Sequence, residues 1–239
     1  MAAVAASQTA MAAIIANSTA LNAVVSSSAA MSAVAASQTA MAAVAASYVA
    51  VAAVYGSAVA VDAVKANETA WATLTGATSA VMGKAVAVLS GLNPDSYADM
   101  TAVASSSTAM AAVIGNSAAL NAVVSSSTAM AAIAASSTAR TAITNSATAK
   151  NALASSPLKT TVTKGNGNGW ENRTIRNGMG YLISCYNANS GGEAGSTWYK
   201  LDGAQTSQPA GTTNVGKFFT SSLAIYWWSS TSSVTYIPC

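Results

Sequence analysis

Hydrophobic positions recur every ten residues over most of the chain, in a unit that reads Met-x-Ala-Val-x-x-Ser-x-x-Ala. An anchor, usually Met, Leu, Val or Trp, opens each unit, and a β-branched residue or Leu follows three positions later in nearly every case. Self-similarity at a fixed period indicates an array of stacked units, each of which buries its apolar face against its neighbours. The anchors are Met1, Met11, Leu21, Met31, Met41, Val51, Val61, Trp71, Met100, Met110, Leu120, Met130, Arg140 and Lys150.

The spacing inside the unit predicts helix. Residues three apart share one face of a helix, whereas they point to opposite faces of a strand. Ala and Met also favour helix, and the strand-favouring aromatic residues are nearly absent from the repeats. A straight continuous helix would nevertheless rotate the anchors by about 80° per unit, because ten residues at roughly 100° each fall short of three turns.

Two arrangements could keep the anchors together. A Ser or Asn stands four residues before the anchors of most units, as at Ser7, Asn17 and Ser27, where a helix N-cap belongs. We therefore favour short helices of about two turns, each restarted at its cap and stacked on the next, since isolated helices this short are unstable in water. The alternative is a long Ala-rich coiled coil, in which the helices would be overwound to about 3.3 residues per turn.

The stretch from residue 76 to residue 99 interrupts the array. It contains Gly76, Gly83, Gly91 and the turn sequence Asn93-Pro94-Asp95, and the next anchor comes one residue earlier than three full units would place it. This composition predicts an irregularity in the stacking. A kink or a docking point for another protein is the alternative interpretation.

After residue 156 the ten-residue period disappears, and short β-type runs alternate with turn clusters rich in Gly, Asn and Pro. The sequence therefore predicts an α+β chain, with a helical repeat domain over 1–156 and a compact antiparallel β-sandwich or barrel over 157–239. The predicted strands are 159–164, 180–186, 197–201, 217–220, 223–228 and 233–237.

Charge and hydropathy limit the partners and the cellular location that we expect for the chain. Charged residues make up 7% of the sequence, and the net charge of +3 comes entirely from the part after residue 156. This excess is too small and too scattered for nucleic-acid binding, which needs a clustered basic face. Polar residues return within every ten positions and the start of the chain lacks a secretory pattern, so we expect no membrane insertion and synthesis in the cytoplasm. A surface rich in Ala and Ser favours self-association.

The residue types present exclude most catalytic chemistry. The chain has no histidine, which removes Ser-His-Asp and Cys-His nucleophile systems and most zinc sites. We expect no enzymatic activity, no catalytic residues, no metal and no cofactor. The two cysteines, Cys185 and Cys239, are expected to be reduced in the cytoplasm, and a disulfide between them or to another chain could form outside the cell.

Aromatic residues crowd into the part of the chain after residue 156, among many Asn, Ser and Gly residues. Exposed rings flanked by such polar groups could stack on sugar rings or contact another subunit, although packing in a small core is the alternative for each of them. Trp227 and Trp228 are adjacent on a predicted strand, so they should face opposite sides. The candidate contact residues are Trp170, Trp198, Tyr199, Trp227 and Trp228.

Two parts of the sequence resemble tail-fibre and related virion structural proteins of tailed bacteriophages. The units at Ser126–Ile133 and Ser37–Val44 resemble their low-charge decapeptide repeats, and the stretch Lys164–Tyr181 is similar to small β-domains at the ends of such proteins. The repeat resemblance covers about two-thirds of the chain and carries no catalytic residues. It implies an elongated homo-oligomer, commonly a homotrimer, attached to other virion proteins.

Three hypotheses of function follow. The first is a non-enzymatic phage virion protein, such as a tail fibre, spike or related appendage, that acts in assembly and in attachment to the host surface. The second is a carbohydrate-binding adhesin module on a repeat stalk, whose partner is a host cell-surface glycan. The third is an ice-binding protein, prompted by the regular Thr and Ala.

Overall fold

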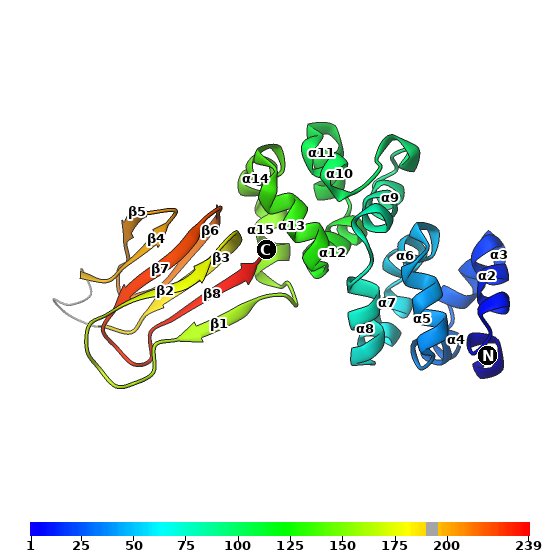
Figure 1. Ribbon diagram of the computed structural model, residues 1–239, viewed down its shortest axis with the longest axis horizontal. Helices are drawn as coiled ribbons and strands as arrows, with labels where there is room; N and C mark the ends of the chain where they lie inside the picture. The colour runs from blue at the N-terminus through cyan, green and yellow to red at the C-terminus, as the bar shows by residue number, and fades with distance from the viewer. Residues whose placement is uncertain (190–195) are drawn as a thin grey trace. The chain divides into compact units, whose positions relative to one another are not determined.

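The computed structural model describes residues 1–189 and 196–239. The described residues form fifteen α-helices and one 3₁₀ helix, followed by eight strands in two antiparallel sheets (Figure 1). The predicted α+β class, a helical array followed by a β part, is therefore confirmed. Contacts divide the chain into two compact units, Met1–Ala132 and Ile133–Cys239.

The helices are short, and most of them have eight or nine residues. They are α1 (Ala2–Ala5), α2 (Gln8–Ala16), α3 (Ser18–Val25), α4 (Ser28–Ala35), α5 (Gln38–Ala45), α6 (Tyr48–Tyr55), α7 (Ala58–Lys65), α8 (Glu68–Thr75), α9 (Ser79–Leu89), η1 (Pro94–Ser96), α10 (Met100–Ser105), α11 (Ser107–Gly115), α12 (Ser117–Ser125), α13 (Ser127–Ala135), α14 (Ser137–Thr144) and α15 (Ala147–Ala154). The array thus breaks the helix once per repeat, and the coiled-coil alternative is not adopted.

The polar residue four positions before the anchor starts most of these helices; the exceptions include α1, which has no side-chain cap, and α10, which is capped by Asp99 directly before the anchor Met100. At Ser37, for example, the backbone is extended and the hydroxyl accepts a hydrogen bond from the backbone N–H of Ala40. Asn17, Asn67 and Asn116 do the same with a side-chain carbonyl oxygen. The cap satisfies one of the donors that the first helical turn leaves without a partner, so the predicted restart at Ser or Asn is confirmed.

Each early helix contacts both its successor and the helix three places later, so three helices make one coil of the array. Successive helices turn sharply, by 98° between α4 and α5 and again between α6 and α7. The anchors and the β-branched residues three positions later face the neighbouring coils, as Met41 and Val44 do at 1% and 3% exposure. Burial between coils supplies the stability that isolated two-turn helices lack.

The alanine just before the anchor is also buried, a feature that the anchor pattern does not predict. Ala40, Ala50 and Ala60 are completely inaccessible to solvent. A residue without side-chain bulk at this position allows neighbouring helices to approach closely. The small size of Ala is therefore a packing requirement as well as a helix preference.

The interruption at 76–99 folds back on itself. The backbone of Asp99 lies so close to Gly83 of α9 that a β-carbon on Gly83 would be 2.2 Å from the Asp99 carbonyl carbon. The Ser79 hydroxyl accepts a hydrogen bond from the backbone N–H of Met100 at 3.2 Å, and Lys84 forms an ion pair with Asp95 at 3.2 Å. The stacking then continues, because α9 contacts both α6 and α12.

The strands form a sandwich of two four-stranded antiparallel sheets within the described residues. One sheet has the order β1-β8-β3-β6 and the other β2-β7-β4-β5. The strands are β1 (Thr160–Thr163), β2 (Glu171–Asn177), β3 (Gly180–Asn187), β4 (Trp198–Leu201), β5 (Ala204–Ser207), β6 (Gly211–Phe219), β7 (Ser222–Trp227) and β8 (Ser233–Pro238).

The sequence pattern misses β2, β5 and the part of β6 before Lys217. Both β2 and β5 are edge strands, and every residue of β5 is exposed. An edge strand with little burial has no apolar alternation from which it could be recognised. The sandwich core lies between the sheets and contains Leu182, Cys185, Tyr199, Phe219, Leu223, Ile225, Trp227, Val234 and Tyr236.

The composition change at residue 156 and the division by contacts do not coincide. The change from helix to strand falls between Ala154 and Thr160, but the second compact unit already begins at Ile133. The reason is that α14 contacts β6, and α15 lies against β3 and β6. The last two helices of the array thus belong to the same compact unit as the sandwich.

In the described part of the chain, no single helix has the length and apolar character needed to cross a membrane, although four bent helix pairs together meet both criteria.

Candidate binding surface on the sandwich

Strand β7 separates its residues cleanly between the two faces of its sheet. Leu223, Ile225 and Trp227 point into the core and are completely buried. Tyr226 and Trp228 face the other side and are partly exposed. The two adjacent tryptophans therefore lie on opposite faces, as strand geometry requires. The Trp227 indole N–H donates to the Glu171 carboxylate at 3.2 Å, which satisfies the one polar atom of that buried ring.

The outward aromatic rings of this sheet pack together. Tyr226 stacks between Trp170, at 4.7 Å between ring centroids and 7° between planes, and Trp198, at 5.2 Å and 18°. Trp228 meets Trp170 edge-on at 5.3 Å, and the Lys200 ammonium lies 4.6 Å from the centre of the Trp198 ring. We call these five residues the aromatic row.

The register of the sheet explains why these side chains meet. Trp198 of β4 is paired with Tyr226 of β7, and cross-strand partners on one face lie within contact distance. Trp170 immediately precedes β2, which pairs with the other side of β7. Tyr226 consequently stands in the middle of the stack, with an indole ring on each side.

The aromatic row offers ring edges, one open indole and one positive charge to an outside partner. The parallel stacking covers much of the ring faces, while Trp170 remains 38% exposed. Ser207 is paired with Trp198 and Gln205 with Lys200, so hydrogen-bonding groups border the row. Aromatic rings beside such polar groups are typical of contact surfaces for other molecules.

The predicted contact residues divide into two groups. The fold brings Trp170, Trp198 and Trp228 together on the outer face, whereas Tyr199 and Trp227 are core residues at 4% and 0% exposure. The sequence analysis did not select Tyr226 or Lys200. Spacing by two residues was the available signal, because Tyr226 precedes Trp228 and Lys200 follows Trp198 by one strand period.

Cys185 and Cys239 are both free thiols, so the disulfide that the sequence left possible between them is not formed in this structure. Cys185 lies in the core of the sandwich, paired with Val234, whereas Cys239 donates its backbone N–H to Met179 at the other end of β3. Several residues of strand separate the two cysteines. Their Cα atoms are therefore much farther apart than the roughly 7 Å that a disulfide tolerates. Burial raises the pKa of both thiols to about 12, although the Arg176 guanidinium acts to lower that of Cys239.

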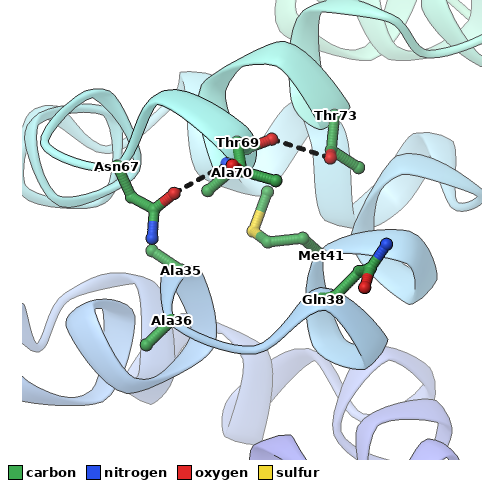
Figure 2. A pocket seen from close by; sticks show the side chains of 8 residues that line it. All are labelled: Ala35, Ala36, Gln38, Met41, Asn67, Thr69, Ala70 and Thr73. Carbon is green, nitrogen blue, oxygen red and sulfur yellow. Dashed lines mark hydrogen bonds between the residues drawn. The ribbon is translucent and has the colours of Figure 1, made fainter.

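A small hollow in the helical array, about 210 Å³ in volume, lies between α4, α5 and α8 (Figure 2). Two of its polar residues, Asn67 and Thr73, form local hydrogen bonds. Asn67 accepts a hydrogen bond from the Ala70 N–H at 3.0 Å, and the Thr73 hydroxyl donates to the Thr69 carbonyl at 2.8 Å. None of the described residues that line it is charged. The hollow is a gap between coils and brings no reactive groups together.

Within the residues that the structure describes, no three His, Cys, Asp or Glu side chains gather into a group that could hold a metal ion. No known protein family and no curated protein matches this chain. The aromatic row on the sandwich and the coil-on-coil array are therefore the features on which a functional proposal can stand.

Proposed function

We propose that the chain is a non-enzymatic structural protein of a virion appendage, such as a phage tail fibre or spike. In this proposal the helical array is a spacer and the sandwich makes the outward contact. The observation that carries it is the array itself, in which capped two-turn helices of Ala, Ser, Val and Met are stacked coil on coil. Such an array extends by adding units, since each coil contacts only its neighbours.

The composition of the array supports a role in assembly. Its exposed positions are mostly Ala, Ser and Thr, and charged residues are rare in it. A surface of small side chains with few charges permits close side-by-side contact between copies, because little charge repulsion opposes it. The proposed partners are other copies of the chain, as in a homotrimer, and other virion proteins.

The solution mass of the purified chain tests this proposal. Light scattering is expected to give a stable multiple of 23.5 kDa, with three copies as the expected number. Electron microscopy of the same sample should show elongated particles. A monomer at all concentrations would sink the proposal that the chain assembles itself into an appendage.

A carbohydrate-binding role for the sandwich is the second candidate, and the aromatic row favours it. A glycan array should then show binding that Trp170→Ala removes, because Trp170 is the most exposed ring of the row. Tyr186→Ala is the matched control, since Tyr186 is 42% exposed but lies on β3 of the other sheet. Equal loss in both variants, or no glycan bound by the parent chain, would count against this role.

A further inference from the structure

A second cavity, about 370 Å³ in volume, lies inside the unit Ile133–Cys239, between α15 and the outer face of strands β3 and β6. Its volume is within the roughly 300 to 1,000 Å³ typical of small-molecule sites. It is distinct from the aromatic row, which lies on the other sheet. Its lining residues are Ala147, Lys150, Asn151, Ala154, Tyr181, Ile183, Asn214, Val215 and Gly216.

The Tyr181 hydroxyl gives this cavity a polar group without a partner. Tyr181 is 1% exposed, and its hydroxyl has no hydrogen-bond partner among the described residues. Its ring is fixed by an edge-on contact with Phe218 at 4.8 Å. A buried polar atom without a partner costs free energy, so a ligand that accepts its hydrogen bond would gain from binding there. Burial also raises the pKa of Tyr181 to about 12, so the hydroxyl keeps its proton and remains a donor.

The cation of the cavity comes from an unusual position in the repeat. Lys150 stands where most units have a Met, Leu or Val anchor, on the helix face that elsewhere packs against its neighbours. Its side chain extends over Gly216, so that a β-carbon there would be 3.1 Å from Lys150 Cδ and 3.2 Å from the Tyr181 hydroxyl oxygen. The absence of a side chain at Gly216 therefore keeps open the space that Lys150 and Tyr181 share.

We propose that this cavity binds a small molecule with one carboxylate, of the size of an acidic monosaccharide. Among the described residues of the lining, Lys150 supplies the only charge and no carboxylate competes for it. The Tyr181 hydroxyl donates a hydrogen bond to the ligand, and the side-chain amides of Asn151 and Asn214 are available for its hydroxyl groups. The apolar wall formed by Ile183 and Val215 fits the carbon skeleton of such a ligand.

Saturation-transfer NMR with the whole chain tests the proposal, with glucuronate and N-acetylneuraminate as probes and glucose as the neutral comparison. The two acids are expected to bind and glucose is not. Lys150→Met keeps the side-chain stem over Gly216 but removes the charge, and it should weaken binding by about tenfold or more. Tyr181→Phe should weaken binding by roughly fivefold, the effect of one hydrogen bond.

Thermal unfolding separates a binding role from a structural one. Tyr181→Phe removes a hydroxyl that has no partner in the fold, so the Tm should stay the same or rise while affinity falls. Lys217→Met, which removes an exposed charge from the same strand β6 outside the cavity, is the control and should bind like the parent.

Three results would overturn the proposal. They are binding of glucose as tight as that of the acids, unchanged affinity in Lys150→Met, and no binding of either acid at about 10 mM, which corresponds to a negligible affinity. The cavity and the aromatic row lie on different sheets, so Trp170→Ala, which tests glycan binding by the row, should leave binding of the acids unchanged.

Discussion

Some cap serines form one hydrogen bond within their own helix and a second one to the preceding coil. The Ser37 hydroxyl accepts a hydrogen bond from Ala40 at the start of its own helix and donates one, at 2.6 Å, to the carbonyl of Ala5 in the preceding coil. Ser57 repeats this with Ala60 and with Val25. A hydroxyl can do both because it is a donor and an acceptor. The cap residue thus also sets the spacing between coils.

Replacing Ser37 by Ala should therefore cost more stability than replacing Ser47. Ser47 caps its own helix through Ala50, and no hydrogen bond from its hydroxyl to another coil is found among the described residues. We expect Ser47→Ala to lower the free energy of unfolding by about 1 kcal/mol and Ser37→Ala by about 2 kcal/mol. Urea denaturation followed by circular dichroism measures both. Equal losses would show that the bond to Ala5 contributes nothing.

Asp202 likewise links two separate segments of the sandwich through hydrogen bonds. It stands with Gly203 in the turn between β4 and β5, where both residues have positive φ angles of 53° and 84°. Its carboxylate accepts hydrogen bonds from the backbone N–H groups of Thr220 and Ser221, in the turn between β6 and β7, and of Ser222 at the start of β7. Partial burial acts to raise the pKa of Asp202, but these hydrogen bonds outweigh it and hold the pKa well below the usual range.

The depressed pKa of Asp202 predicts how the stability of the sandwich depends on pH. A carboxylate whose pKa is lower in the folded state stabilises the fold above its unfolded pKa of about 3.9, and this contribution disappears as the pH falls toward the folded value. Asp202→Asn should cost about 1 to 2 kcal/mol at pH 7, a figure reduced for the exposure of the site. The difference between the parent and Asp202→Asn should shrink as the pH is lowered from about 4. A difference that stays constant down to pH 2 would contradict this account.

At the scale of elements, the close approach of α9 to the following turn depends on Gly83. A methyl group there would collide with the backbone of Asp99, which cannot move aside as a flexible side chain could. We expect Gly83→Ala to destabilise the array by about 1 to 3 kcal/mol, in the range of overpacked sites.

Gly115→Ala is the matched control for Gly83→Ala. Gly115 also lies in a helix, α11, but a β-carbon on it would meet nothing within 4 Å. The greater helix propensity of Ala should raise stability there by up to about 1 kcal/mol. Thermal unfolding of the two variants should therefore shift in opposite directions, and a fall of the same size in both would refute the packing argument.

At the scale of the whole molecule, the position of the last two helices determines where the second folding unit begins. Helices α14 and α15 lie against the outer face of the sheet that contains β3 and β6, where Tyr181 is buried. A fragment of residues 133–239 should consequently unfold at a higher temperature than a fragment of residues 157–239. The shorter fragment exposes the apolar face that these helices cover, and it should also associate more readily. Identical Tm values would place the boundary at residue 156, where the composition changes.

The sequence alone determined the elements whose signals are local. The ten-residue period, the helical spacing of its anchors and the polar caps predict short stacked helices, because capping and amphipathic spacing act within one or two turns. Alternation likewise predicts β7, with Trp227 and Trp228 on opposite faces, and the absence of histidine was decisive for the chemistry that could be expected.

Which distant residues meet depends on how the whole chain packs. The three-helix coil, the burial of the alanine before most anchors, the edge strands β2 and β5, and the separation of Cys185 from Cys239 depend on contacts between segments far apart in the chain. The aromatic row depends on the register of β4 against β7, and the cavity of Lys150 and Tyr181 on a helix packed against a sheet. No single stretch of sequence encodes such a juxtaposition, because it results from the burial of apolar surface by the whole unit.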